Sequence, residues 1–219
     1  MTFSWNTIKS CANRARISGM LASICFMVLA LALVVSLPKA HAQQPATPKV
    51  AITYKSAPNP YYSARNARQV DTIVIHYISG VNVDRARWDD PQLALQILKQ
   101  YRVSAHYLID RDGAIYTLVP ERHVAWHAGG SIMPSPDNRR NVNNFSIGIE
   151  CIATKESGFT EAQYRSLSHL VQDISSRHPI RHLVGHDEIS GARAVRLGLR
   201  RDVKPDPGAR FDWSRIPGR

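Results

Sequence analysis

The sequence has few cysteines and none of the compact metal-binding motifs. Cys11, Cys25 and Cys151 are the only cysteines among 219 residues. Because we expect the first two to be removed with an N-terminal signal, Cys151 would have no partner within the mature chain, and a disulfide-stapled scaffold is excluded. The chain also lacks an HExxH motif, a paired CxxC motif and any internal repeat. Spacing alone therefore gives no support for a metal site.

Acidic residues are outnumbered by basic ones. The chain has 28 Lys and Arg against 17 Asp and Glu, a formal charge of +11, and removal of residues 1–42 would lower it to +7 because that segment holds four basic residues and no acid. The basic residues are scattered rather than arranged in a stripe, and neither an aromatic-basic platform nor a nucleic-acid-binding motif is present. We therefore do not expect nucleic acid as the partner; for an exported protein, the positive charge favours anionic cell-wall polymer or anionic lipid.

The N-terminal segment has the pattern of a secretory signal peptide. Three basic residues precede an uncharged, mostly apolar run over residues 20–37, and Ala40 and Ala42 form an Ala-x-Ala cleavage site. We therefore expect residues 1–42 to be removed and the protein to be exported to the periplasm or cell envelope. An uncleaved membrane anchor is the alternative, because the apolar run approaches the roughly 20 residues that span a bilayer.

The remaining sequence divides into an arm and one domain. Residues 43–69 contain four prolines and little apolar periodicity, which is typical of a linker or extended arm. Residues 70–219 mix β-branched runs with amphipathic segments and predict a single α/β domain. An Asp-Gly step at 112–113 predicts a hairpin, and 121–144 is expected to be a long functional loop. We expect strands at 72–77, 105–109, 114–119, 146–152 and 183–184, and helices at 91–100 and 160–178.

Histidine is the most prominent residue type that can carry chemistry. Eight of the nine histidines follow the signal segment, and most lie in helical or surface positions that need no ligand role. His76 and His186 differ, because each stands at the end of a predicted strand, where the loops of α/β sheets gather functional groups. The two histidines alone leave metal binding and an ordinary structural role equally open.

Six sequence segments carry a resemblance that covers about residues 70–213. They are IVIHY (73–77), VSAHYLIDRDG (103–113), AWHAGGS (125–131), NNFSIGIE (143–150), GHDEIS (185–190) and KPDPGARFDW (204–213). In this order they resemble the type 2 N-acetylmuramoyl-L-alanine amidases, a family that includes short phage endolysins and peptidoglycan recognition proteins. The resemblance implies a mixed central β-sheet flanked by helices, and a zinc ion held by His76, His186 and Asp206.

The resemblance also implies roles for further residues. Glu150 matches the family's acid/base residue, and Lys204 matches the basic residue that stabilises the oxyanion. His127 and Asn144 occupy positions that contact substrate. Two histidines and one carboxylate leave a fourth tetrahedral position for water, as in catalytic zinc sites, and zinc lowers the pKa of that water to roughly 7. The implied reaction is zinc-dependent hydrolysis of the amide bond between N-acetylmuramic acid and L-alanine in peptidoglycan or its fragments.

Two features depart from the family pattern. The connection between His186 and Asp206 is several residues longer than expected and rich in arginine, so Asp187 or Asp202 remains an alternative carboxylate ligand. The Asp-Pro-Gly sequence that begins at Asp206 favours that residue. Ala105 stands where short phage endolysins carry a catalytic tyrosine, which favours a mechanism that depends on glutamate.

Two alternative functions remain open. A non-catalytic peptidoglycan-binding protein would use the same fold, but such proteins lose metal ligands that are all present here. A zinc peptidase on the same fold would cut within the peptide rather than beside the sugar. In each case the expected partners are peptidoglycan or muropeptides, and nucleic acid is not expected. A membrane is involved only if the N-terminal segment stays attached, and nothing in the sequence demands more than a monomer.

Overall fold

The computed structural model describes residues 52–66 and 69–219. The expected signal peptide (1–42) and the first part of the expected linker or arm lie outside these residues. Within the described ranges, no helix combines the length and the apolar character needed to cross a membrane.

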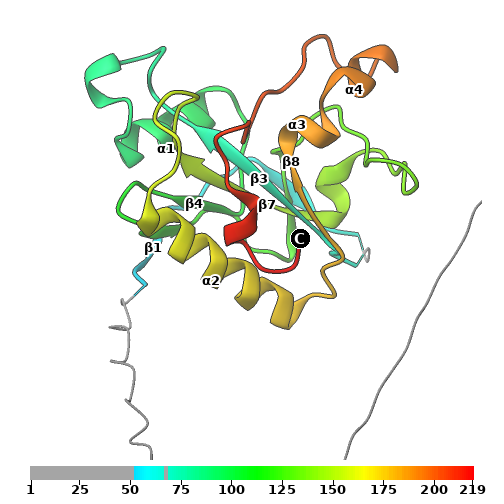
Figure 1. Ribbon diagram of the computed structural model, residues 1–219, viewed down its shortest axis with the longest axis horizontal. Coiled ribbons are helices and arrows are strands. Elements are labelled where there is room, and N and C mark those ends of the chain that lie inside the picture. The colour runs from blue at the N-terminus through cyan, green and yellow to red at the C-terminus, as the bar shows by residue number, and fades with distance from the viewer. Residues whose placement is uncertain (1–51, 67–68) are drawn as a thin grey trace, which may run out of the picture. The chain divides into compact units, whose positions relative to one another are not determined.

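A six-stranded sheet forms the centre of the domain (Figure 1), with the strand order β1-β5-β4-β7-β3-β8. The strands are β1 (Tyr54–Ser56), β3 (Thr72–Ile78), β4 (Tyr107–Ile109), β5 (Ile115–Thr117), β7 (Ser146–Ile152) and β8 (His182–Gly185). The hairpin strands β4 and β5 pair antiparallel, and the other neighbouring pairs are parallel. The mixed sheet implied by the resemblance is therefore confirmed. A separate antiparallel pair joins β2 (Tyr62–Ala64) to β6 (His123–Ala125).

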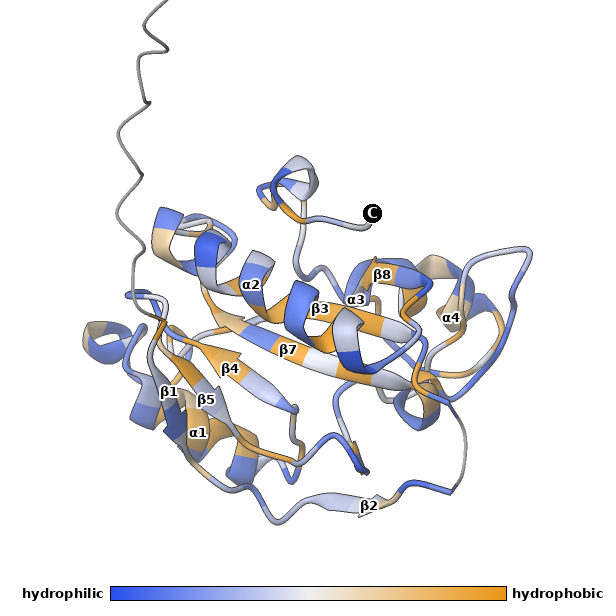
Figure 2. Ribbon diagram, turned by 90° about the horizontal axis from the view of Figure 1, so that it is seen from below, coloured by the Kyte–Doolittle hydropathy of each residue, from blue (hydrophilic) through white to orange (hydrophobic). Residues whose placement is uncertain are grey.

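Two capped helices pack on opposite faces of this sheet (Figures 1 and 2). Asp90 caps α1 (Pro91–Gln100), and Thr160 with Gln163 forms a capping box at the start of α2 (Glu161–Arg177). The apolar side of α2 buries a cluster against one face of the sheet, and α1 buries a smaller cluster beside β4 and β5 on the other face. The main apolar residues of α2 in this contact are Leu167, Leu170, Val171 and Ile174.

Alternation along the strands places the polar residues of interest on the α1 face. On β3, Ile73 and Ile75 belong to the cluster under α2, whereas Val74 packs on the opposite side. His76 follows Val74 in this alternation, and its register partner on the parallel strand β7 is Glu150. Both side chains therefore lie on the α1 face, near the carboxyl ends of two central strands.

The rest of the α1 face is covered by irregular chain and short helices. The segment 128–145 and α3 (His186–Ile189) bury an apolar cluster over β3 and β8. A further short helix, α4 (Ala192–Arg196), follows α3 before the chain returns to the sheet at Asp206. Figure 2 shows the apolar strands β4 and β7 between α2 on one side and α1 on the other. His76 and Glu150 line one cavity together with residues of α1 and the first residue of α3.

Part of the segment expected as a linker or arm belongs to the folded domain. Strand β1 pairs with β5 at the edge of the sheet, and β2 pairs with β6. Arg65 fastens this segment to the sheet, because its guanidinium donates to the carbonyl oxygens of Glu121 at 3.1 Å, His123 at 2.7 Å and Ser146 at 3.0 Å. The folded part therefore begins before Val70.

Candidate metal centre and active site

Three side chains from distant parts of the sequence meet on the α1 face. His76 comes from β3, His186 is the first residue of α3 just after β8, and Asp206 lies in the connection that follows α4. The Nδ1 atoms of the two histidines are 3.0 Å apart, and Asp206 Oδ2 is 3.1 Å from each of them. All three residues are buried, with exposed fractions of 1%, 5% and 7%. The structure thus brings together the three residues expected to hold a metal.

The alternative carboxylates do not join this group. Among the described residues, the cluster of potential metal ligands consists of His76, His186 and Asp206 alone. Asp187 instead uses its backbone N–H, which donates to Asp206 O at 2.8 Å and so helps to fix the ligand loop. Asp202 is exposed.

Hydrogen bonds behind His76 determine which ring nitrogen carries its proton. Ser146 donates its hydroxyl proton to Val142 O at 2.7 Å. The same hydroxyl oxygen therefore accepts the hydrogen bond from His127 Nε2, which lies 3.2 Å away. His127 therefore carries its proton on Nε2, and its Nδ1 accepts a hydrogen bond from His76 Nε2 at 3.0 Å. With its proton on Nε2, His76 presents a free lone pair on Nδ1.

A hydrogen bond also shows that Nε2 of His186 carries a proton. Its Nε2 lies 3.3 Å from Ala128 O, a carbonyl oxygen that accepts hydrogen bonds only, so Nε2 carries the proton. Burial, together with the neighbouring charge of His186, lowers the pKa of His76 to about 4, and burial also holds the pKa of His127 well below its usual value. The Nδ1 atoms of His76 and His186 therefore face the same point as the carboxylate oxygen of Asp206.

This donor set fits a zinc ion. Two ring nitrogens and one carboxylate oxygen lie 3.0 to 3.1 Å from one another, an arrangement that a cation stabilises. Two imidazole nitrogens and a carboxylate are ligands that zinc takes in catalytic sites, and each histidine has the outer hydrogen-bond partner typical of a metal ligand. The residues present therefore match the cofactor that the resemblance implies.

Glu150 lies beside this cluster and lacks a stabilising partner. It is 8% exposed, and its Oε2 atom has no hydrogen-bond partner among the residues that the structure describes. Burial raises the pKa of Glu150 to about 8, the charge of Asp206 adds to the rise, and the charge of Lys204 opposes it. A carboxyl group with this environment can exchange a proton near neutral pH.

A cavity of about 550 Å³ joins Glu150 to the three clustered residues and opens to solvent. Lys204 lines it from the connection that leads to Asp206, and His127 lines it from below His76. The lining also includes a group of apolar and aromatic residues, Ile97, Leu98, Tyr101, Val103 and Trp126. Arg200 lines the cavity as well, from the arginine-rich connection. The sequence pointed to the arginines of this connection as a group, Arg200 among them, and did not predict which of them lines the cavity.

The neighbouring asparagines have different positions. Asn144, expected to contact substrate, is exposed and is not among the residues that line this cavity, whereas Asn143 does line it. Asn143 Oδ1 accepts hydrogen bonds from the backbone N–H of His127 at 3.2 Å and of Ala128 at 2.8 Å. The doubled Asn-Asn of NNFSIGIE was the available signal, and it did not distinguish the two residues.

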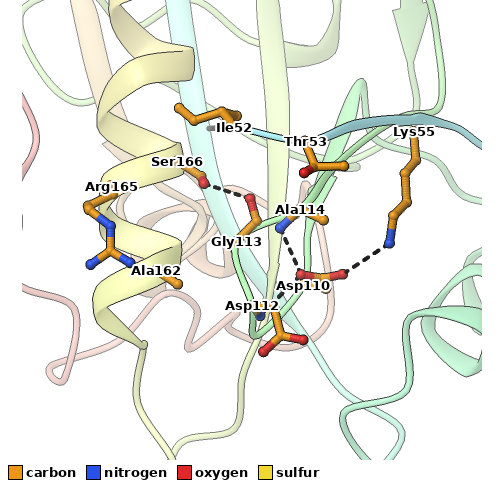
Figure 3. A pocket seen from close by; sticks show the side chains of 10 residues that line it. All are labelled: Ile52, Thr53, Lys55, Asp110, Asp112, Gly113, Ala114, Ala162, Arg165 and Ser166. Carbon is orange, nitrogen blue, oxygen red and sulfur yellow. Dashed lines mark hydrogen bonds and ion pairs between the residues drawn. The ribbon is translucent and has the colours of Figure 1, made fainter. Parts of the chain in front are cut away.

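A second cavity, of about 350 Å³, lies near the β4–β5 turn and α2 (Figure 3). Asp110 lies in this cavity, and its Oδ1 accepts from the backbone N–H groups of Asp112 at 3.1 Å and Ala114 at 2.8 Å. Ser166 of α2 donates to Gly113 O at 2.6 Å. These polar groups hold the turn against α2, and we assign this cavity no catalytic role.

Residues 66–209 match the family model described as N-acetylmuramoyl-L-alanine amidase. The chain belongs to this amidase family. The 1,6-anhydro-N-acetylmuramyl-L-alanine amidase AmpD of Haemophilus influenzae is 37% identical over 172 residues, which cover 72% of this chain and 86% of that protein. The amidase AmiD of Escherichia coli is 31% identical over 166 residues, or 68% of this chain, but this chain spans only 52% of AmiD.

Solved structures of amidases show the same fold. A selenomethionine AmpD derivative superposes with a TM-score of 0.61 at 33% identity, covering 76% of this chain and 93% of that one. Escherichia coli AmiD in complex with anhydro-N-acetylmuramic acid-L-Ala-D-gamma-Glu-L-Lys gives a TM-score of 0.53 at 30% identity, covering 69% of this chain and 58% of that one. The predicted family, fold and amidase function are thereby confirmed. The metal ion and the individual residue roles stay predictions.

Proposed function

We propose that this protein hydrolyses the amide bond between N-acetylmuramic acid and L-alanine in peptidoglycan or its muropeptide fragments, with zinc held by His76, His186 and Asp206. The observation that carries the proposal is the convergence of three potential ligand atoms beside Glu150, inside a cavity open to solvent. A closed structural zinc site would have a fourth protein ligand, and the described residues supply three.

Each side chain around the metal position is suited to a distinct step of the reaction. Zinc supplies Lewis acidity, which makes water a nucleophile near neutral pH and polarises the carbonyl of the amide. Glu150 accepts the proton of the attacking water and delivers it to the departing nitrogen of L-alanine. Lys204 lines the same cavity and places a positive charge where the carbonyl oxygen becomes negative. His127 holds His76 in the tautomer that binds metal.

The proposed substrate follows from the relatives and from the size of the cavity. AmpD is named for 1,6-anhydro-N-acetylmuramyl-L-alanine, and the AmiD complex contains an anhydro-muramoyl tripeptide. A cavity of about 550 Å³ is in the range that holds a ligand of a few residues. Soluble muropeptides and chain ends of the polymer therefore both fit the proposal. The proposed place of action is the periplasm or cell envelope, because residues 1–42 have the pattern of a signal peptide.

Digestion of peptidoglycan and of purified muropeptides, followed by mass analysis, tests this function. We expect release of intact stem peptides with a free N-terminal L-alanine, loss of release with a chelator and recovery with zinc. Shorter peptides would instead indicate a peptidase, and binding to the polymer without any release would indicate a non-catalytic protein.

Variants of two histidines connect the activity to the metal cluster. His186→Ala should lose bound zinc and lower activity by about 10³-fold or more, because the Lewis acid contributes several kcal/mol to catalysis. His169→Ala is the matched control, since His169 lies exposed on α2. Full activity in a zinc-free His186→Ala protein would contradict the proposed metal site.

A further inference from the structure

The arginine-rich connection, residues 191–203, is packed against the site rather than extended into solvent. A Cβ atom added to Gly130 would lie 1.9 Å from Leu199 O, so the two backbones touch at a position that only glycine permits. Arg193 donates to Met133 O at 2.9 Å, and the N–H of Lys204 donates to Ser190 O at 3.0 Å. These contacts fix both ends of the connection and thereby hold Arg200 at the cavity.

Some hydrogen-bond donors of the Arg200 guanidinium have no partner among the described residues. Its Nε donates to the backbone oxygen of Asp202, and its two terminal nitrogens have no hydrogen-bond partner within residues 52–66 and 69–219. In those ranges neither Arg200 nor Lys204 forms an ion pair. A guanidinium anchored through Nε presents a fork of two nitrogens that matches a carboxylate.

The cavity lining combines aromatic surface with positive charge. Tyr101 and Trp126 supply aromatic rings and have exposed fractions of 67% and 39%, and Arg200 and Lys204 supply positive charge from the connection. The acids that line the cavity, Glu150 and Asp206, are buried and belong to the catalytic cluster. A substrate with a sugar at one end and an anionic group near the cut bond matches this combination.

The stem peptide carries such a group. In the tripeptide bound to AmiD, the second residue is glutamate joined through its γ-carboxyl group, which leaves its α-carboxylate free. Standard backbone dimensions put this carboxylate roughly 6 to 7 Å from the nitrogen of L-alanine. One cavity is lined by both the metal cluster and Arg200, so it can receive the cut bond and the carboxylate together.

We propose that Arg200 is a specificity-determining residue that binds the free α-carboxylate of the second stem residue. This proposal rests on the proposed function, since it identifies which muropeptides the amidase selects. Lys204 is assigned to the carbonyl oxygen because it precedes Asp206 by two residues and its charge acts on both His76 and Glu150. The connection that makes this chain longer than expected thus supplies the substrate contact.

Two matched substrates test the proposal. N-acetylmuramoyl-L-Ala-γ-D-Glu-L-Lys and its analogue with D-isoglutamine in place of γ-D-Glu share the same scissile bond and the same γ-linkage to lysine, and they differ only in the α-carboxylate replaced by an amide. We expect the wild-type protein to prefer the acid by about 10- to 100-fold in kcat/KM, the range for hydrogen bonds to charged groups. Arg200→Ala should remove this preference by slowing cleavage of the acid alone, and Arg200→Lys should retain part of it.

Arg201→Ala is the control, because Arg201 is the exposed neighbour and does not line the cavity. It should keep the wild-type preference. The proposal is overturned if the wild type does not discriminate, if Arg200→Ala slows both substrates equally, or if Arg201→Ala has the same effect as Arg200→Ala. A thermal unfolding midpoint for each variant excludes loss of folded protein as the cause.

A binding measurement separates this proposal from the proposed function. If the wild type cleaves neither compound, the amidase activity fails, and calorimetry with the same two intact compounds still tests the contact. Tighter binding of the acid in the wild type, and its loss in Arg200→Ala, would support the assignment of Arg200. Equal binding of the acid and the amide by the wild type would contradict the assignment of Arg200.

Discussion

Asp110 and Glu150 are almost equally buried, with exposed fractions of 7% and 8%, yet their surroundings differ. Two backbone N–H groups and the Tyr116 hydroxyl donate to Asp110, and Lys55 lies 4.0 Å away (Figure 3). Glu150 has an oxygen without any partner among the described residues, and burial raises its pKa to about 8. Burial therefore does not identify the catalytic acid in this domain. Glu150 is distinguished from Asp110 by its oxygen without a partner and by its place beside His76 and Asp206 in the cavity, because a group that must exchange protons cannot have its oxygens fully occupied.

The largest expected effect is on catalytic activity, and it distinguishes Glu150 from Asp110. Glu150→Gln should lower kcat by about 10²- to 10⁴-fold, the contribution of a positioned acid/base, while zinc stays bound. Zinc content by metal analysis and kcat on a muropeptide check both parts. Loss of zinc together with activity would show that Glu150 is a ligand and that its assigned role is wrong.

Asp110→Asn is the matched control for that substitution. Asparagine keeps an oxygen for the two backbone N–H groups that donate to Oδ1, but its amide nitrogen cannot replace Oδ2, which accepts from the Tyr116 hydroxyl and pairs with Lys55. The substitution should cost roughly 1 to 3 kcal/mol of stability and leave the activity of the folded protein unchanged. Chemical denaturation and kcat measure the two quantities. If Asp110→Asn lowered kcat as far as Glu150→Gln does, the distinction between the two cavities would fail.

The sequence predicted the central elements well because they carry local signals. The β-branched runs gave β3 and β7, the Asp-Gly turn gave the β4–β5 hairpin, and the capping box at Thr160 gave the start of α2. His76 and His186 were recognisable at strand ends, while Asp206 came from the resemblance. Their meeting point depends on strand order, which no local pattern contains.

Other features depend on tertiary contacts and gave little signal. Strands β1 and β2 are three residues each and exposed along their length, so they lack the alternation that marks a half-buried strand. Their pairing partners fix them in place instead. His186 was expected to enter a loop, yet it begins α3, and Arg200 reaches the cavity because Leu199 packs on Gly130. Such contacts between distant segments are invisible along the sequence.

A smaller effect extends the comparison to two buried serines. Ser146 and Ser166 each donate to a backbone carbonyl oxygen, but Ser146 also orients His127 behind the metal cluster, whereas Ser166 holds the turn beside Asp110. Ser146→Ala should weaken zinc binding about 10- to 100-fold, as loss of an outer hydrogen-bond partner does, and Ser166→Ala should not. Competition with a chromogenic chelator measures the affinities. Equal zinc affinity in the two variants would show that Ser146 has no part in orienting His76.

The smallest effect concerns how stability depends on pH in the metal-free protein. The pKa of Glu150 is raised by folding from an ordinary 4.5 to about 8, so between these values the folded state binds a proton that the unfolded state has released. Stability should therefore fall as the pH rises from about 5 to 8, and this part of the slope should vanish in Glu150→Gln. Thermal unfolding at a series of pH values in chelator should show the two proteins diverging towards pH 8, with the variant the more stable. Parallel curves across this range would mean that the carboxyl group of Glu150 finds a partner in solution, and its contrast with Asp110 would disappear.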